Sequence, residues 1–275
     1  MHRISRIRFL RRAGLVRAIV LMFSACASCG VAFPATDASF GSSLDGTAAA
    51  FKPYLLGQVG ASLTATRAMR EYVAAGDLAG AQKSWLAARD GWEQSEIIAA
   101  ELFPDLDRAI DAWPDALRGF HAVEARLFGA HSADALGAAD ELVRNLTEFE
   151  RQVRASPVRA QTLLNGITRL LYEIGEDKSG GGESPFSGNS LQEVVSNVTA
   201  IDTAYQRVFA RSVQRKNAQL GGAVSADLAR LRQMTSVPSL KLLDAAQLRD
   251  LTETLTSNFI SAGRDLGLQS PQLGN

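Results

Sequence analysis

The sequence predicts an all-α protein built from two packed helical bundles. Ala and Leu recur throughout, aromatic residues make up only 7% of the chain, and long β-branched runs are absent, a composition that favours helix over sheet. Apolar residues also return at intervals of three and four, the period of an amphipathic helix. With 275 residues and 46% hydrophobic content, the chain can bury a sizeable core in one large domain or two small ones.

Residues 1–27 have the layout of a secretory signal peptide, with six Arg, a short apolar run and then small residues. The letters A-C-A before Ser28 give a cleavage pattern, whereas F-S-A before Cys26 resembles a lipobox that would make Cys26 a lipidated N-terminus. Both readings place the mature protein in the periplasm, the second as a membrane-anchored lipoprotein. An uncleaved anchor is disfavoured, because Arg17 interrupts an apolar run that stays under the roughly 20 residues a spanning helix needs.

Both cysteines, Cys26 and Cys29, lie in or beside this leader, so we expect no disulfide framework in the mature domain. Without the leader's six Arg, 23 of the 29 basic residues remain, against 29 acidic residues. This acidic balance argues against nucleic acid or an anionic membrane surface as a partner. We expect a flexible tether over 28–46, a helical domain over 47–268 and a disordered tail over 269–275.

The first helices are delimited by proline, glycine and aspartate. Pro53 is suited to the first turn of a helix whose apolar positions run to Gly76. Asp77 is a suitable N-cap for a second helix, whose apolar stripe reaches about Phe103. These signals predict a helical hairpin at the start of the domain.

The next segments are predicted from prolines and a cap. Pro104 ends the pattern, a short turn or helix follows, and Pro114 opens a helical segment that stops near Gly129. Ser132 can cap the next helix and Pro157 can open the one after it. The N-terminal part of the domain therefore holds about five helices.

Residues 176–190, EDKSGGGESPFSGNS, form a Gly-rich loop. No strand precedes its three glycines and no G-K-[ST] follows them, so a phosphate-binding loop is disfavoured and a flexible connection or lid is favoured. Beyond it we expect helices near 191–219, 225–235 and 244–266. The loop splits the helices into two unequal groups, which suits two packed bundles.

Acidic residues crowd the stretch 92–124, around His121 and with only Arg108 and Arg118 to balance them. Like charges this close repel each other when a fold brings them together, so either they spread over a solvated face or something positive lies among them. We favour a metal ion as that positive charge.

Two pairs of residues in this stretch have the spacing of metal ligands. Residues three apart share a helix face, so Glu93 lies beside Glu96 and His121 beside Glu124, and two such faces can meet in a bundle to bind metal. Carboxylates with one imidazole suit iron, manganese or zinc and disfavour Cu(I). Iron is our first choice, although the spacing does not select it. An ExxE on a helix is more often a solvated face, and a lone HxxE is common by chance.

Three motifs in order resemble the imelysin-like family, in particular its EfeO/EfeM-type periplasmic iron-uptake proteins. They are W-E-Q-S-E at 92–96, D-L-D-R-A-I-D at 105–111 and G-F-H-A-V-E at 119–124. A fourth block, in which the family has K-x-x-G-E-E, S-H-T-D-L and an Asn, is matched by Lys178, Gly181, Glu183, Ser187, Leu191 and Asn197. Gly188 and Ser190 stand where the family has His and Asp, which puts the function of that block in question.

The resemblance implies an imelysin-like fold and a specific set of metal ligands. These ligands are Glu93, Glu96, Asp111, His121 and Glu124, with Glu183 as a weaker candidate. Asp105 and Asp107 would cap or solvate the turn. The implied function is capture of iron and its delivery to a membrane permease that works with a haem-containing peroxidase. The chain looks like the short EfeM form, which lacks a cupredoxin domain.

Two other functions remain open. The family was also assigned to metallopeptidases, active or vestigial, because HxxE was read as half of a zinc-protease site. A zincin needs two His one turn apart in H-E-x-x-H, and His121 has no second His at that spacing, so we expect a protein that is not an enzyme. The third reading is an envelope module that binds acidic polysaccharide and carries a structural metal.

Overall fold

The computed structural model describes residues 38–112, 118–176, 178 and 182–271, and it contains no strand in these ranges. The longer helices are α1 Ala38–Ala75, α2 Leu78–Ser95, α6 Leu136–Ala155, α7 Ala160–Glu176, α8 Ser190–Ala204, α10 Ala218–Thr235 and α11 Ala245–Asp265. The shorter elements are η1 Glu96–Ile98, α3 Ala99–Leu102, α4 Pro104–Ile110, α5 Gly119–Glu124, η3 Ala125–Gly129, η5 Tyr205–Phe209, α9 Ala210–Lys216 and η6 Leu240–Leu242. The prediction of an all-α fold is confirmed.

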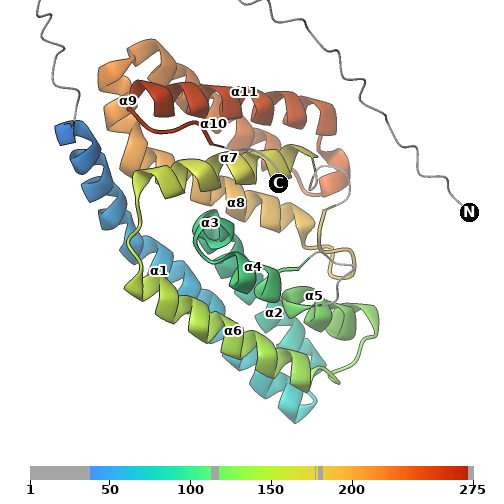
Figure 1. Cartoon of the computed structure of the whole chain (residues 1–275). Coiled ribbons are helices and arrows are strands. Elements are labelled where there is room, and N and C mark those ends of the chain that lie inside the picture. The colour runs from blue at the N-terminus through green and yellow to red at the C-terminus, as the bar shows by residue number, and fades with distance from the viewer. Residues whose placement is uncertain (1–37, 113–117, 177, 179–181, 272–275) are drawn as a thin grey trace, which may run out of the picture. The chain divides into compact units, whose positions relative to one another are not determined.

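The helices form two packed groups, as expected (Figure 1). In the first, α1 lies along both α2 and α6; in the second, α7 packs on α11, while α10 packs on α8 and α11. Contacts between α2 and α8 join the groups. The Gly-rich loop does not divide them as we predicted, since α7 precedes the loop and yet belongs to the second group. The apolar residues of α7 cover more than one face, from Leu163 and Leu164 to Leu170 and Leu171, so the helix can be buried between several neighbours.

The helical fold begins before the expected limit of 47, and its last helix, α11, ends at Asp265, before the expected limit of 268. Helix α1 begins at Ala38, inside the expected tether, where Leu44 is buried and Asp45 Oδ1 accepts a hydrogen bond from Ala160 N at 2.9 Å. This contact supplies an acceptor for one of the backbone donors that the first turn of α7 leaves unpaired. At the other end, Gln269 N donates to Gln161 Oε1 at 2.8 Å. The leader 1–27, with Cys26, and the last residues 272–275 lie outside the described residues.

The helical hairpin at the start of the domain forms as predicted, with two corrections. Gly76, at φ 73°, ends α1, and the Asp77 side chain caps α2 by accepting from Gly80 N at 2.9 Å. Pro53, however, lies inside α1 and not in its first turn. Helix α2 ends at Ser95 and continues as η1 and α3, so the regular helix does not reach Phe103. The break coincides with a close approach of α7, because a Cβ on Gly166 would lie 1.6 Å from Ile97 O.

The segment that holds the HxxE motif is short and tightly placed. Pro104 opens α4, as expected, whereas Pro114 lies outside the described residues. Gly119 opens α5 at φ 54°, and a Cβ on it would lie 1.9 Å from Ile110 O. Only glycine fits this conformation at this distance, so Gly119 sets how closely α5 approaches α4. A turn of π-helix, η3, then leads to Gly129.

Several later boundaries differ from the prediction. Ser132 does not cap α6, which begins at Leu136; the Ser132 hydroxyl accepts from Asp134 N instead. Helix α7 begins at Ala160, three residues after Pro157. Asn217 separates α9 from α10 and caps α10, which begins at Ala218 and not near 225 as predicted. Asp244 caps α11, at the boundary that the sequence predicted.

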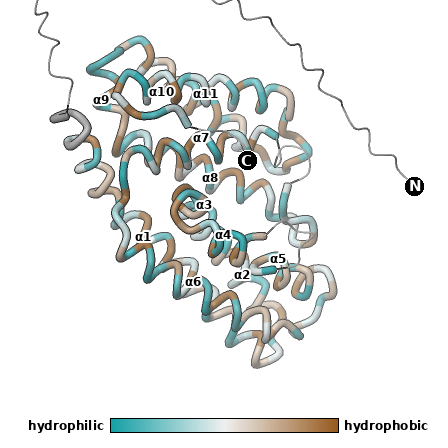
Figure 2. Tube along the Cα trace, in the orientation of Figure 1, coloured by the Kyte–Doolittle hydropathy of each residue, from teal (hydrophilic) through white to brown (hydrophobic). Residues whose placement is uncertain are grey.

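The interior of the first group is rich in aromatic rings. Trp92 packs edge-on against Phe149 at 5.3 Å between ring centres, Phe103 against Phe149 at 5.5 Å and Trp85 against Phe120 at 6.3 Å. Figure 2 shows hydrophobic and hydrophilic residues alternating along the helices, as expected of amphipathic helices. Two of these rings, Trp85 and Phe120, lie 6.0 and 5.1 Å from the guanidinium carbon of Arg89 on α2. No helix in the described part of the chain is long and apolar enough to cross a bilayer.

Candidate metal centre

The candidate centre lies where the C-terminal end of α2 meets the start of α8, helix α5 and residues 182–189. Arg89 and Glu93 are in the last two turns of α2, and Glu96 follows in η1. Contacts of α2 with α8 and α5 bring in residues that are distant in the sequence. The centre is therefore assembled from both helical groups.

Arg89 is fully buried and pairs with carboxylates from three segments. Its Nη1 lies 2.6 Å from Asp111 Oδ2, its Nε donates to Glu193 Oε1 at 2.9 Å and its Nη2 donates to Glu93 Oε1. The guanidinium carbon also lies 5.1 Å from the centre of the Phe120 ring, a cation–π distance. Burial alone lowers the pKa of Arg89, but Asp111, Glu193 and Glu93 outweigh it and raise the pKa well above its usual value.

Lys178 is the second buried cation of the centre. Its side chain is 1% exposed, and its Nζ lies 2.9 Å from Glu93 Oε2, 3.0 Å from Glu183 Oε2 and 2.8 Å from Asn197 Oδ1. Burial lowers the pKa of Lys178, but the surrounding carboxylates, Glu183 first, raise it well above its usual value. An ammonium with three oxygen neighbours at these distances stays charged.

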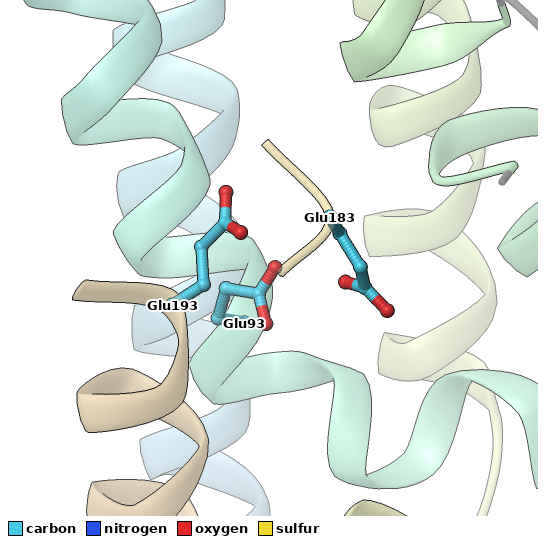
Figure 3. A group of neighbouring side chains, drawn as sticks. All are labelled: Glu93, Glu183 and Glu193. Carbon is cyan, nitrogen blue, oxygen red and sulfur yellow. The ribbon is translucent and has the colours of Figure 1, made fainter. Parts of the chain in front are cut away.

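Three carboxylates converge in this part of the structure. Glu93, Glu183 and Glu193 each offer an oxygen, and these oxygens lie within 4.8 Å of one another (Figure 3). The Glu193 side chain is 1% exposed, and its Oε2 is buried without a hydrogen-bond partner. Burial and neighbouring carboxylates raise the pKa of Glu183 to about 7, against the opposing effect of Lys178. Such a group of oxygens is a donor set for a hard cation.

His121 lies between two of the predicted ligands. Its Nε2 is 3.2 Å from Asp111 Oδ1 and its Nδ1 is 3.3 Å from Glu124 Oε2. Burial lowers the pKa of His121, but the hydrogen bonds with Asp111 and Glu124 raise it to about 9. For Asp111, burial raises the pKa, and Arg89 and His121 together bring it well below its usual range. The ring is therefore an imidazolium held between two carboxylates at neutral pH.

Glu124 connects α5 by hydrogen bonds to the loop between α7 and α8. Its Oε1 accepts from Phe186 N at 3.2 Å and from both the backbone N and the hydroxyl of Ser187, each at 2.8 Å. Burial raises the pKa of Glu124, but these bonds and His121 lower it overall. At the two positions that depart from the family pattern, Gly188 adopts φ 70°, and Ser190 Oγ accepts from Ser184 N at 3.1 Å.

Glu96 belongs to a second group of charges. Its Oε2 accepts a hydrogen bond from Asn197 Nδ2 at 3.3 Å, and its Oε1 lies 3.6 Å from Arg169 Nη2. Arg169 also forms an ion pair with Glu173. Burial raises the pKa of Glu96. It also raises the pKa of Glu173 to about 8 and that of Asp107 to about 7, with the charge of Glu96 adding to both. We call Arg169, Glu96, Asp107 and Glu173 the side cluster.

We call the remaining buried charges around Arg89 the central cluster: Arg89, Lys178, Glu93, Asp111, Glu183 and Glu193. Of the five ligands predicted from the resemblance, Glu93 and Asp111 lie in it, His121 and Glu124 extend from Asp111, and Glu96 lies in the side cluster. Asp105 is exposed and pairs with Arg108, as expected of a residue in a solvated turn. The same expectation is wrong for Asp107, which is half-buried and has an unpartnered Oδ1.

Sequence reasoning missed the most connected residues of the centre. Arg89 precedes Glu93 by four residues, the spacing of a helical ion pair, and this signal was available in the sequence. Lys178 was recognised only as a match to the family pattern. Glu193 carried no signal of its own, because it is a single acidic residue at the start of a helix, 104 residues from Arg89.

The comparisons with known proteins identify the family. The Imelysin family (Peptidase_M75) matches residues 54–118 and 115–258. The iron uptake system component EfeO of Yersinia pseudotuberculosis is 32% identical over 165 residues, which are 56% of this chain and 44% of that protein. EfeO of Escherichia coli O1:K1 is 29% identical over 166 residues, 57% of this chain and 44% of that protein, and EfeO of strain K12 is 28% identical with the same shares.

The matched segment thus spans less than half the length of these curated relatives, which are named as components of an iron uptake system. The family match is wider, since it extends over most of the described helices, from α1 to α11. It includes α2, α5 and α8, which carry Arg89, His121 and Glu193. The chain therefore belongs to the imelysin family, and it is similar to EfeO.

Proposed function

We propose that this protein captures a metal ion as a component of an iron-uptake system, with iron as the first choice and zinc or manganese as alternatives. The observation that carries the proposal is the interior group of Glu93, Glu183 and Glu193, where a Glu193 oxygen is buried without a hydrogen-bond partner. Leaving a buried carboxylate oxygen unpaired is costly, and a coordinated cation removes that cost. The names of the EfeO relatives support the choice of iron.

The proposed ligand set combines this group with the residues that the family resemblance implies. Glu93, Glu183 and Glu193 supply oxygens first, because they already lie together. Asp111 and His121 are connected to them through Arg89, and they would add a carboxylate and an imidazole. To coordinate a metal, His121 must give up its proton. Glu96 and Glu124 remain proposed ligands on the resemblance alone. Oxygen donors with one imidazole suit iron, manganese and zinc.

In this proposal the ion is cargo. The protein is exported to the periplasm, either free or anchored through a lipid on Cys26, and passes the ion to a membrane permease that works with a haem peroxidase. Capture and release involve no bond-breaking step, so we propose a binding protein and not an enzyme.

Peptide hydrolysis is the second candidate, because the family is named as a peptidase family. The only other histidine in the described residues, His131, is exposed and follows η3. Moreover, both nitrogens of the His121 ring face carboxylates. Casein cleavage that is abolished by a chelator and by His121→Ala would favour hydrolysis over transport.

Equilibrium dialysis of the purified protein against iron and zinc tests the binding proposal. We expect wild type to bind at micromolar concentration and Glu93→Gln, Glu193→Gln and His121→Ala to bind at least about tenfold more weakly, since removing a ligand or its outer partner typically costs that much. Glu141→Gln, which removes a carboxylate from the exposed face of α6, is the matched control and should bind as wild type does.

Comparing metal binding among the variants shows which candidate residues are ligands. If Glu96→Ala binds as wild type does while Glu193→Gln does not, the site is in the central cluster. If wild type and all variants bind no metal, the proposal fails. Retention of the metal-free protein on an alginate column would then favour the polysaccharide-binding reading.

A further inference from the structure

Three carboxylates of the central cluster each have one oxygen in contact with Arg89 and a second oxygen with different surroundings. Arg89 contacts Glu93 Oε1, Asp111 Oδ2 and Glu193 Oε1, one oxygen of each. The second oxygens have different surroundings: Glu93 Oε2 contacts Lys178, Asp111 Oδ1 contacts His121, and Glu193 Oε2 has no hydrogen-bond partner. Arg89 therefore holds the carboxylates in place while leaving one oxygen of each directed elsewhere.

Lys178 takes the place that a cation would take among these second oxygens. Its Nζ contacts two of the three carboxylates of the metal-binding group, Glu93 and Glu183, and the amide oxygen of Asn197, all between 2.8 and 3.0 Å. An ion coordinated by Glu93 Oε2 and Glu183 Oε2 would compete with the ammonium for the same oxygens. A positive charge left within about 4–6 Å would also oppose the binding of a second one.

The two buried cations differ in how they are held. Arg89 lies in the last two turns of α2, has carboxylate partners on three segments and lies over the Phe120 ring. The contacts of Lys178 with Glu93, Glu183 and Asn197 are made by Nζ, at the end of a stem with four rotatable bonds. Its head group can therefore leave without moving the helices that carry the carboxylates.

We propose that Lys178 is an internal competitor of the metal ion: its ammonium neutralises Glu93 and Glu183 in the ion-free protein, and the arriving ion displaces it. This inference rests on the proposed function and specifies how the same site is regulated. In the ion-free state Lys178 offsets the repulsion among buried carboxylates. In the bound state its charge favours release, so the site exchanges its cargo instead of retaining it. Because a monovalent cation is exchanged, ions of higher charge are favoured over Na⁺ and K⁺.

Lys178→Met tests the proposal, since it removes the charge and keeps an unbranched apolar stem. We expect the affinity for Mn²⁺ and Zn²⁺, measured by competition with a chelating dye, to rise about tenfold or more, the size of effect that one nearby charge has on a proton affinity. The dissociation rate of the ion should fall. Lys178→Gln, also neutral and able to hydrogen-bond, should show the same direction. Lys83→Met, which removes an exposed charge from α2, should have no effect.

A second measurement excludes a merely structural role for Lys178. Without ions, the Lys178→Met variant should unfold at a lower temperature than wild type, because Glu93 and Glu183 lose their counter-charge. With saturating Zn²⁺ the deficit should disappear. An equal deficit with and without ion, or an affinity that is unchanged or lower in both neutral variants, overturns the proposal. If neither wild type nor the variants bind any ion, the proposed function fails with it.

Discussion

The central cluster and the side cluster have similar acidic groups but different numbers of cations. Three carboxylates of the central cluster contact Arg89, and two contact Lys178. The side cluster has Arg169 alone, which contacts Glu96 and Glu173. Burial raises the pKa of Asp107 to about 7 and that of Glu173 to about 8, and each keeps an unpartnered oxygen.

The difference shows that the number of cations in contact with a buried carboxylate decides its pKa here, since Glu173 contacts Arg169 alone and its pKa is still raised to about 8. Asp111 contacts Arg89 and His121, and its pKa falls well below the usual range in spite of burial. Glu183 is the intermediate case, with Lys178 at 3.0 Å and Arg89 only at 4.0 Å, and its pKa rises to about 7. Asp111 of the central cluster is therefore ionised at neutral pH, whereas Glu173 of the side cluster holds a proton.

Removing the central cation should have the largest effect. We expect Arg89→Met to lower the free energy of unfolding by about 3–5 kcal/mol, because Glu93, Asp111 and Glu193 are left buried without their partner. Urea unfolding measures the loss. Adding Glu193→Gln should recover part of it, whereas Arg144→Met on the exposed face of α6 should change little. A loss below about 1 kcal/mol, the range of surface ion pairs, would contradict the view that Arg89 neutralises buried carboxylates.

The hydrogen bond from Trp92 to Asp111 should have the next largest effect. Trp92 Nε1 donates to Asp111 Oδ2 at 2.6 Å, and a bond to a charged group contributes about 1.5–3 kcal/mol. Trp92→Phe should lose this amount, in addition to the change in packing. Trp85→Phe is the matched control, since Trp85 Nε1 donates to the neutral Phe120 carbonyl at 3.1 Å. Equal losses in the two variants would show that the charge of Asp111 is unimportant.

The raised pKa values in the side cluster should make the stability of the protein depend on pH. Because the pKa values of Asp107 and Glu173 are raised to about 7 and about 8, these two groups bind more protons in the folded protein than in the unfolded chain above about pH 4. Stability from these groups is complete below that pH and is lost as pH rises towards 8. Each proton contributes a slope of at most about 1.4 kcal/mol per pH unit.

The double variant Asp107→Asn, Glu173→Gln isolates this slope. Its free energy of unfolding, measured between pH 5 and 8, should fall less steeply with rising pH than that of wild type. The difference between the two proteins is the relevant quantity, since other groups also titrate in this range. Parallel pH profiles would show that both carboxylates are ionised in the folded protein.

The exposed pair should have the smallest effect. Arg108 and Asp105 form an ion pair with side chains that are 69% and 94% exposed, and such pairs contribute little because water and salt screen them. Arg108→Ala should leave the urea midpoint within experimental error. A measurable loss of stability would mean that exposure to water does not explain why this ion pair contributes less than the ion pairs of the central cluster.

Local sequence signals were sufficient for most of the fold. The all-α class, the cap at Asp77 and the start of the last helix near 244 were predicted correctly, because helix period and capping depend on neighbours within one or two turns. The start of α1 and the inclusion of α7 in the second group were missed. Both depend on distant contacts, such as the one between Asp45 and Ala160.

For the centre, the sequence by itself determined that acidic residues and one imidazole would be concentrated on α2, α4 and α5, and it favoured a positive charge among them over a solvated face. Only the tertiary structure decided that Arg89 and Lys178 are part of that positive charge. Arg89 reaches Glu193 across 104 residues of sequence, and Lys178 reaches Glu93 across 85. Coulomb energy depends on distance in space and on burial, and neither can be read from spacing along the chain.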